Sequence, residues 1–325
     1  MQSLDIVYKL QRLALGNETD YSLPENVDWK EAIQLSYVQA VPVQVCEGLE
    51  ILYEKNPDLN LELDTPKYEN MRFEWCGQKL ILEHLHKKHN KRVIQLTRMF
   101  ADIGFRTCLL KGQGCALMYP DPLIRNCGDI DLWVEGGRKK ILSALKPKWK
   151  ISHIVNHHAK VEFFNDVSVE IHYVPAWLYN PFNNRKLQRF FKTTAESQFS
   201  NMTDYGFAVP TVRFNLVYLS IHLYKHIYEG NATIKQMTDY YYLLKASSYD
   251  DRRETYEFLK KLGMGSYVAY LMSCLHNNLG LSDDFLLCTP SNKRHRPVSE
   301  LLWLYPWKIG HFIWRLFNGY LFIYT

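Results

Sequence analysis

The stretch that decides the fold is Thr107–Val134, TCLLKGQGCALMYPDPLIRNCGDIDLWV. It begins with a short apolar run, Thr107–Leu110, which is typical of a buried strand. The segment KGQG follows at 111–114, and its glycines allow backbone amides to come close to a ligand. A short helix is predicted over Gly114–Tyr119, because the proline at position 120 ends it. The sequence therefore predicts a strand, a glycine loop and a short helix in succession.

Two acids lie in the strand that ends this stretch. The segment Gly128–Val134 reads GDIDLWV, and a period of two puts Asp129 and Asp131 on one face, with Ile130 on the other. Two carboxylates so close raise each other's pKa unless a cation lies between them. Magnesium is the natural cation for an all-oxygen site. The alternative is a solvated strand edge, and the glycine loop just before the pair favours the metal site.

A third acid comes from a later hairpin. The segment His158–Tyr173 reads HAKVEFFNDVSVEIHY, and Asn165-Asp166 is predicted to turn between two strands. In the second strand, Glu170 and His172 share one face, and the apolar residues share the other. A buried acid between β-branched residues is costly without a partner. Glu170 is therefore the preferred third acid, and Glu162, on the first strand, is the competing candidate.

These motifs resemble the nucleotidyltransferase superfamily of the DNA polymerase β type. In that superfamily a strand and a glycine-containing loop lead into a helix, Asp-x-Asp follows on the next strand, and a third carboxylate lies on a later strand. Within it, the sequence resembles bacterial nucleotidyltransferases with a Leu-Lys-Gly loop, an arginine ahead of Asp-Ile-Asp, and a Glu-x-His strand. The matching segments, in order, are Leu110-Lys111-Gly112, Arg125, Asp129-Ile130-Asp131 and Glu170-Ile171-His172.

The resemblance implies a mixed α+β fold with a small nucleotidyltransferase-type β-sheet core and flanking helices. The core is expected over residues 96–175, between mainly helical regions at 1–95 and 176–325. The resemblance also implies transfer of a nucleotidyl group from a nucleoside triphosphate to an acceptor. Two Mg²⁺ ions, or Mn²⁺ in their place, are then expected on the catalytic acids Asp129, Asp131 and Glu170.

The resemblance gives roles to further residues. Lys111 and Arg125 are expected to neutralise phosphate charge, and Gly112 and Gly114 to admit loop amides near phosphate. Two more residues are expected to contact substrate or phosphate, Gln113 and His172. The secondary site candidates are His158, His222, His226 and Asp239.

One departure from the superfamily lies in the loop. Lys111-Gly112 stands where Gly-Ser is usual, so the serine contact to the triphosphate is missing. This departure leaves open a non-catalytic regulatory protein that binds a nucleotide or another anion on the same fold. A third alternative is a hydrolase that holds its metal on histidines, for which the candidates are His157, His158, His222 and His226.

A long helix is predicted from about Phe73 to Phe100, directly before the first core strand. Its polar face is basic, which fits either a metal or phosphate patch or a solvated face. The spread of these residues around the helix favours the solvated face. The members are His84, His86, Lys87, Lys88, His89, Lys91 and Arg92.

Two apolar helices are predicted over 213–228 and 234–244. Asp239 lies inside the second one, where an isolated acid is costly. We expect it to pair with His222, His226 or a lysine. Two lysines of this region, Lys225 and Lys235, are phosphate partners by charge alone.

The composition limits the classes of substrate and the cellular location to be expected. The chain has 325 residues and a formal net charge of +5, which permits an anionic substrate but gives no strong nucleic-acid signal. No two of its cysteines have Cys-x-x-Cys spacing and the N terminus lacks a signal-peptide core, so a cytoplasmic location is expected. Charged residues interrupt the apolar tail 300–325, so no membrane span is expected. The sequence assigns neither the nucleotide, the acceptor nor the oligomeric state.

Overall fold

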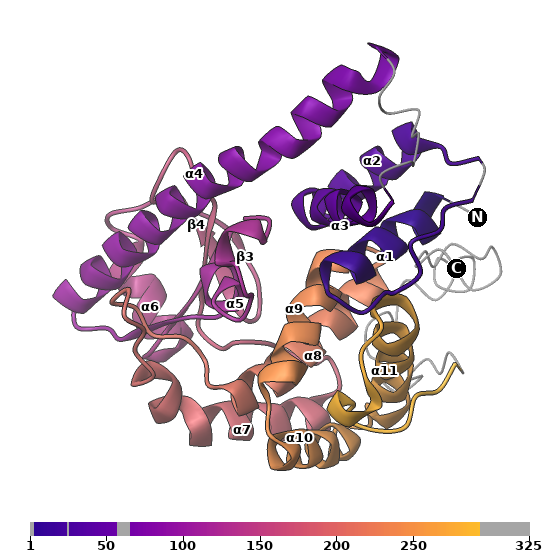
Figure 1. Cartoon of the computed structure of the whole chain (residues 1–325). Helices are drawn as coiled ribbons and strands as arrows, with labels where there is room; N and C mark the ends of the chain where they lie inside the picture. Colours follow the sequence, from indigo (N-terminus) through magenta and orange to yellow (C-terminus); the bar gives the residue numbers. More distant parts are fainter. Residues whose placement is uncertain (1–2, 25, 57–65, 293–325) are drawn as a thin grey trace, which may run out of the picture.

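The computed structural model describes residues 3–24, 26–56 and 66–292 of the chain. Within these ranges the fold is mixed α+β, as the sequence predicts, with a five-stranded sheet surrounded by helices (Figure 1). The tail 300–325, for which packed helices without a membrane span were predicted, lies outside the described residues.

The sheet has the strand order β1-β2-β5-β4-β3. Only β2 and β5 pair in parallel, and the other neighbours are antiparallel. The predicted turn at Asn165-Asp166 is confirmed as a hairpin connection, because Ala159 on one strand lies opposite Ile171 on the next. The strands are β1 (Thr107–Leu109), β2 (Ile130–Val134), β3 (Ile151–Ile154), β4 (His158–Val161) and β5 (Val169–His172).

The two faces of the sheet pack against different helices. On one face the buried side chains of Ile130, Leu132 and Ile171 join a cluster with α4 (Pro66–Asp102) and α6 (Gly137–Leu145). This division follows from the alternation of side chains along each strand. The opposite face carries the acids, and it is covered by helices from the C-terminal half of the chain.

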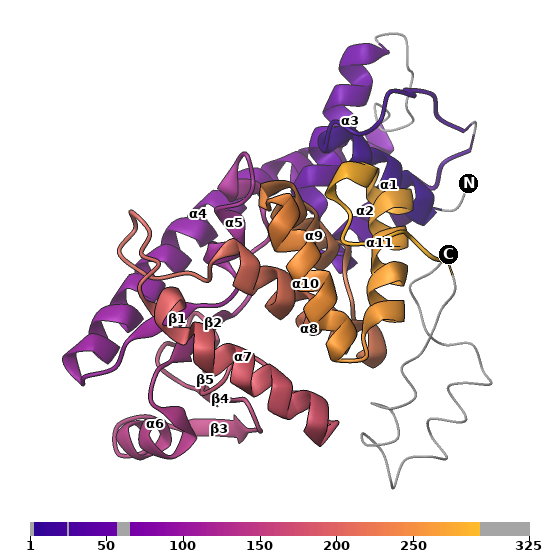
Figure 2. The same cartoon turned by 90° about the horizontal axis from the view of Figure 1, so that it is seen from below.

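Trp133 of β2 anchors those helices to the acid-bearing face. Its ring contacts Phe199 of α7 (Pro181–Phe199) at 4.6 Å between centroids and Phe214 of α8 (Val212–Glu229) at 5.7 Å. Figure 2 shows α7 lying across the strands on the side opposite α4. The packing therefore fixes α8 above the face that carries Asp131.

Helices from both ends of the chain share one core. Gln11 donates a hydrogen bond to Thr238, and Asn17 donates one to Tyr241, so the first helix is tied to the ninth. The division into units at 1–95, 96–175 and 176–325 stays a prediction. The helices concerned are α1 (Ser3–Ala14), α2 (Trp29–Val38), α3 (Pro42–Lys55), α9 (Ile234–Ala246), α10 (Tyr249–Lys261) and α11 (Gly265–Leu279).

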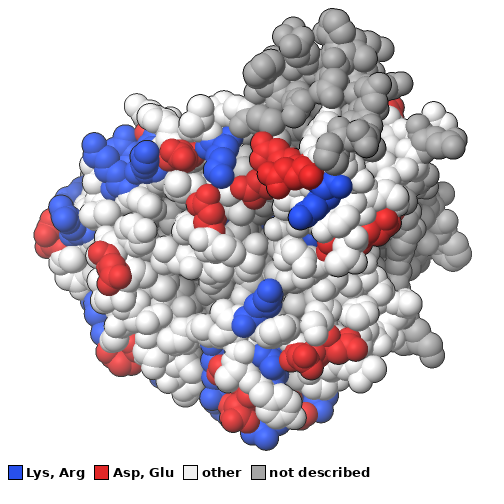
Figure 3. Space-filling model, viewed as in Figure 1, with Lys and Arg blue, Asp and Glu red and all other residues white. Residues whose placement is uncertain are grey.

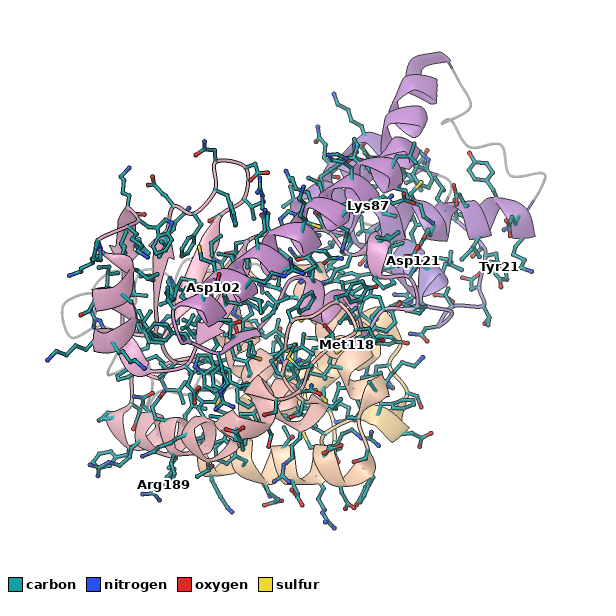
Figure 4. The ribbon with its side chains drawn as sticks, turned by 90° about the vertical axis from the view of Figure 1, so that its left-hand side faces the viewer. Tyr21, Lys87, Asp102, Met118, Asp121 and Arg189 are labelled. Atoms are coloured by element: carbon teal, nitrogen blue, oxygen red, sulfur yellow. The ribbon has the colours of Figure 1, made fainter. Side chains whose placement is uncertain are left out.

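Helix α4 runs across the whole molecule and begins earlier than the sequence predicts. It starts at Pro66 instead of about Phe73, in keeping with the fixed φ that suits proline to a first helical turn. Figure 4 shows α4 with Lys87 and Asp102 labelled along it, and Asp121 near its middle. An ion pair joins α4 to the segment that contains Asp121, with 3.7 Å between Lys79 Nζ and Asp121 Oδ2.

Two further observations concern the described helices and one face of the surface. None of the described helices has the length and apolar character needed to cross a membrane. On the face seen in Figure 3, Lys and Arg are interspersed with Asp and Glu, with no single broad basic surface. No disulfide joins the six cysteines whose side chains the structure describes.

Candidate active site

The glycine loop lies directly against the acid-bearing strand. Gly112 has φ +62°, in the region that favours glycine, and a Cβ added there would lie 3.4 Å from the carbonyl oxygen of Asp129. The amide of Leu110 donates a hydrogen bond to the carbonyl of Asp131 at 2.9 Å. The loop therefore continues the pairing of β1 with β2 and ends beside the acids. It leads into α5 (Gln113–Ala116).

The three predicted acids converge. Asp131 of β2 lies opposite Glu170 of β5 in the parallel register, and Asp129 precedes Asp131 on the same face. One oxygen from each of the three carboxylates lies within 4.8 Å of the others. Glu162, the competing candidate, instead pairs with Lys150 at 3.0 Å on the exposed surface. The sheet thus brings together the acid pair and Glu170.

Asp131 is buried and receives two positive partners on the same oxygen. Lys111 Nζ and His172 Nε2 each lie 3.0 Å from Asp131 Oδ1. Burial alone would raise the pKa of Asp131, but Lys111 and His172 outweigh burial and hold that pKa well below its usual range. Burial would likewise lower the pKa of Lys111, and the carboxylates around it raise it instead. Asp131 is therefore ionised at neutral pH.

Asp129 has the opposite electrostatic environment. The charge of Asp131 raises the pKa of Asp129, and burial raises it further, while Lys111 offsets only part of this rise. The like-charge repulsion that the sequence predicts therefore acts on Asp129. A cation placed between the two acids would relieve it.

The site fits a divalent metal ion. The second carboxylate oxygen of Asp131, Oδ2, is buried and has no hydrogen-bond partner. An unpaired buried carboxylate oxygen is costly, and a cation in the group formed with Asp129 and Glu170 would satisfy it. Carboxylate oxygens of this kind are the ligands that Mg²⁺ prefers. Asp129, Asp131 and Glu170 would hold the ion.

Arg125 has a partner that the sequence did not predict. Its guanidinium donates to both carboxylate oxygens of Asp239 on α9, with Nε to Oδ1 at 2.7 Å and the second contact at 2.9 Å. Tyr119 adds a hydrogen bond to Oδ1 at 2.8 Å. The expected pairing of Asp239 with His222, His226 or a lysine is therefore wrong. Arg125 is the nearest buried cation, and its planar fork suits a carboxylate better than an imidazole does.

Two histidines of α4 hold the loop before Asp129. His86 Nε2 donates to the carbonyl of Arg125 at 2.7 Å, and His89 Nε2 donates to the carbonyl of Gly128 at 2.8 Å. Both side chains are buried, so the prediction that they belong to a solvated basic face is wrong for these two. Their spacing of three residues was the available signal, because it puts both on one side of a helix.

The side chain of Gln113 belongs to the same support. Its amide nitrogen lies 3.4 Å from His86 Nδ1 and 3.5 Å from the sulfur of Cys127, and the residue is buried. Gln113 therefore faces α4 and the loop before the acids. The expected contact of its side chain with phosphate stays a prediction.

A pocket of about 650 Å³, counted with its open mouth, lies beside the acids. Loop residues Lys111 and Gly112 and the acids Asp129 and Asp131 form one wall, with Arg125 and Asp239 nearby. Helices α8 and α9 form the other wall, through His222, His226, Lys235 and Gln236.

The helical wall of the pocket carries neutral and positive groups. Burial lowers the pKa of His222 well below its usual value, and the charge of Lys111 adds to this effect. Burial also lowers the pKa of His226, whose Nδ1 contacts Asn231 Oδ1 at 2.7 Å. Burial lowers the pKa of Lys235, and the charge of Arg125 lowers it further. An anion in the pocket would offset the cost of keeping Lys235 charged.

His157 and His158 lie near Glu170. His158 of β4 has its Nε2 3.5 Å from Glu170 Oε2. His157 lies beside it, and the two rings are 4.5 Å apart between centroids. The groups of possible metal ligands in the described part of the chain do not unite His157 and His158 with His222 and His226. The described residues thus do not form the four-histidine site of the hydrolase alternative.

Comparison with known proteins gives a family. The family described as "uncharacterised nucleotidyltransferase" matches residues 25–280. Among solved structures, the chain is similar to an antigenic nucleotidyltransferase-like protein from Paracoccidioides brasiliensis, at 12% identity and a TM-score of 0.32, covering 59% of this chain and 92% of that chain. No curated protein matches. The family match includes the glycine loop, both aspartates and Glu170, and the chain belongs to this family of uncharacterised nucleotidyltransferases.

Proposed function

We propose that the protein is a magnesium-dependent enzyme that transfers a nucleotidyl group from a nucleoside triphosphate to the hydroxyl of an acceptor. The observation that carries this proposal is the convergence of Asp129, Asp131 and Glu170 beside the glycine loop. The family match supports nucleotidyl transfer as the reaction class. The open pocket next to the acids supports a substrate with several phosphates.

The acids and the metal have distinct roles in this proposal. Asp129 and Asp131 would hold one ion, and Glu170 would help to hold a second ion and accept the proton of the acceptor hydroxyl. Mg²⁺, or Mn²⁺ in its place, supplies charge stabilisation for the attacking and leaving oxygens. Lys111 and His172 keep Asp131 ionised and oriented through their contacts with Oδ1. Catalysis would then depend on positioning and electrostatics.

The phosphates would lie between the loop and α9. Gly112 lines the pocket, where its amide and that of the next residue would approach an anion; Gly114 instead lies against Leu109 and Val209. Lys235 faces the same pocket from α9, and a Cβ added to Gly128 would lie 3.8 Å from Lys235 Nζ. Arg125 lines the pocket but already uses its guanidinium on Asp239. We therefore assign Lys235 the phosphate contact that the missing loop serine would otherwise make.

A second candidate function follows from the position of Lys111. Its ammonium group lies 3.0 Å from Asp131 Oδ1, so it neutralises part of the charge that would attract a metal ion. A protein that binds a nucleotide or another anion without transferring it fits this arrangement. In that case Lys111 would serve as a built-in cation.

One experiment separates the two functions. Purified protein is incubated with Mg²⁺, each nucleoside triphosphate and a panel of hydroxyl acceptors, and pyrophosphate release is measured beside calorimetric binding. Pyrophosphate release that disappears in the Asp129→Asn variant supports the transferase. Tight binding without release by the wild type, across the whole panel, supports the binding protein.

A further inference from the structure

Two imidazoles lie near one carboxylate oxygen of Glu170. His158 Nε2 lies 3.5 Å and His172 Nε2 lies 3.7 Å from the same carboxylate oxygen, Glu170 Oε2. The centroids of the two rings are 5.1 Å apart. Ligand atoms of all three residues lie within 4.8 Å of one another. The three side chains come from the adjacent strands β4 and β5, so the sheet fixes their spacing.

These separations suit metal ligands better than hydrogen-bond partners. Good N–H···O bonds have donor–acceptor distances of about 2.7–3.2 Å, and both contacts with Glu170 are longer. Around a tetrahedral ion with bonds of about 2.1 Å, neighbouring ligand atoms are about 3.4 Å apart. The distances of 3.5 Å and 3.7 Å approach that spacing.

Three polar atoms at this cluster have no hydrogen-bond partner, although the two Nδ1 atoms lie across their rings from the Nε2 atoms that would bind an ion. The Nδ1 atoms of His158 and His172 and the Oδ2 atom of Asp131 are buried without a hydrogen-bond partner. His172 Nε2 is also 3.0 Å from Asp131 Oδ1, so the cluster adjoins a fourth ligand. The side chains of His158 and Glu170 are 13% and 23% exposed. An ion can therefore reach the cluster from solvent.

We propose that His158, Glu170 and His172 form a mixed nitrogen and oxygen site for a divalent first-row transition-metal ion. Imidazole nitrogen suits such ions, whereas Mg²⁺ prefers oxygen ligands. The two ends of the acid cluster therefore differ: the Asp129 end offers oxygen alone, and the Glu170 end offers two nitrogens with its carboxylate. An ion at the Glu170 end takes the place of the proton that His172 Nε2 shares with Asp131.

The inference refines the metal centre of the proposed function, and its test is independent of turnover. Mn²⁺ is the probe, because its unpaired electrons report the nuclei bound to it. The metal-stripped wild type is titrated with Mn²⁺ and followed by electron paramagnetic resonance, and pulsed measurements then detect ¹⁴N coupling. We expect ¹⁴N coupling from two imidazoles, and retention of Mn²⁺ at Mg²⁺ concentrations that fill an all-oxygen site.

Three variants assign the nitrogens. His158→Gln is expected to lose one nitrogen coupling and to weaken Mn²⁺ binding by about tenfold or more. His157→Gln is the matched control, because His157 adjoins the cluster but is not among its ligands; both properties should be unchanged. Asp129→Asn should keep the nitrogen coupling even if transfer is lost, which separates failure of this inference from failure of the proposed function.

The wild-type spectrum, recorded with Mg²⁺ present to fill the all-oxygen site, can overturn the inference even if a variant fails to fold. Mn²⁺ coupled only to oxygen ligands and water would show that the two histidines merely orient the carboxylates. The same conclusion follows if folded His158→Gln, checked by its thermal unfolding, binds Mn²⁺ as tightly as the wild type.

Discussion

Asp131 and Glu170 lie directly opposite each other on β2 and β5, in the one parallel pair of the sheet. Directly paired residues on one face of a sheet have their side chains in contact range. Two acids at such positions repel each other unless positive groups intervene, and Lys111 and His172 supply those groups on the Asp131 side. Asp129 has no comparable support, which makes the two aspartates experimentally distinguishable.

Asp129→Asn and Asp131→Asn should therefore separate activity from stability. Removal of the Asp129 charge relieves its repulsion with Asp131, so the free energy of unfolding should stay equal or rise. Removal of the Asp131 charge leaves Lys111 buried without its counter-charge, which should cost about 3–5 kcal/mol. Both variants should lose at least about 10²-fold in transfer rate. Urea unfolding and pyrophosphate release measure the two effects, and equal destabilisation by both would contradict this account.

Lys235→Met should weaken nucleotide binding without changing the fold. A charge-assisted contact of this kind contributes ~1.5 kcal/mol, or about tenfold in Kd. Calorimetry with a nucleoside triphosphate and the matching monophosphate checks the assignment, because only the triphosphate should lose affinity. Lys235→Arg keeps the charge and serves as the control. A loss that is the same for both nucleotides would remove Lys235 from the triphosphate site.

Asp239→Asn should be strongly destabilising, by about 3–5 kcal/mol, because it leaves the guanidinium of Arg125 buried without a counter-charge. Tyr119→Phe removes one hydrogen bond to the same carboxylate and should cost about 1 kcal/mol. Glu162→Gln breaks the exposed pair with Lys150 and should change stability by less than about 1 kcal/mol. Chemical denaturation ranks the three, and a small effect at Asp239 would show that α9 is held by other contacts.

Two half-buried histidines should make the metal-free protein acid-sensitive. Burial, with a smaller effect from the charge of Lys225, lowers the pKa of His157 to about 2. Burial, with a smaller effect from the charge of His172, lowers the pKa of His158 to about 4. In the unfolded chain a histidine titrates near about 6.5. Below that pH the unfolded state takes up protons that the folded state does not, so the free energy of unfolding falls as the pH falls from 6.5 towards 4.

The contribution of His172 to stability depends on pH in the opposite direction. Burial would lower the pKa of His172, but its contacts with Asp131 and Glu170 raise it instead. Its stabilising contribution is thus complete below about pH 6.5 and is lost as the pH rises through the folded value. Unfolding in the presence of a chelator at several pH values tests both effects. His157→Gln should reduce the acid loss, and His153→Asn, at an exposed position of β3, should leave it unchanged.

The sequence alone was sufficient to predict those features that depend on neighbouring residues. A period of two identifies the face of Asp129 and Asp131, and β-branched neighbours identify the strand of Glu170 as buried. The glycine loop is likewise recognisable from its own residues, because the segment 111–114 reads KGQG. These features depend on a few adjacent residues, so the three acids could be named without coordinates, whereas the fold class was implied by the resemblance to a known family.

The missed contacts join distant segments. Arg125 and Asp239 are 114 positions apart, and sequence alone gives no way to rank Arg125 above the histidines or lysines as the partner. His86 and His89 look like members of a solvated face, because their spacing of three residues puts them on one side of the helix but does not tell whether that side is buried. Tertiary packing decides both cases.

The unbroken course of α4 sets its permitted length. The helix has 37 residues and spans about 55 Å. Its Lys79 forms an ion pair with Asp121, and its His86 and His89 donate hydrogen bonds to the loop before Asp129. One residue inserted between Lys79 and His86 would rotate both imidazoles by about 100° relative to the lysine. Seven inserted residues would almost restore the phase. They would also move Lys79 about 10 Å along the helix axis, so the contacts of Lys79, His86 and His89 together fix the length of α4 between them.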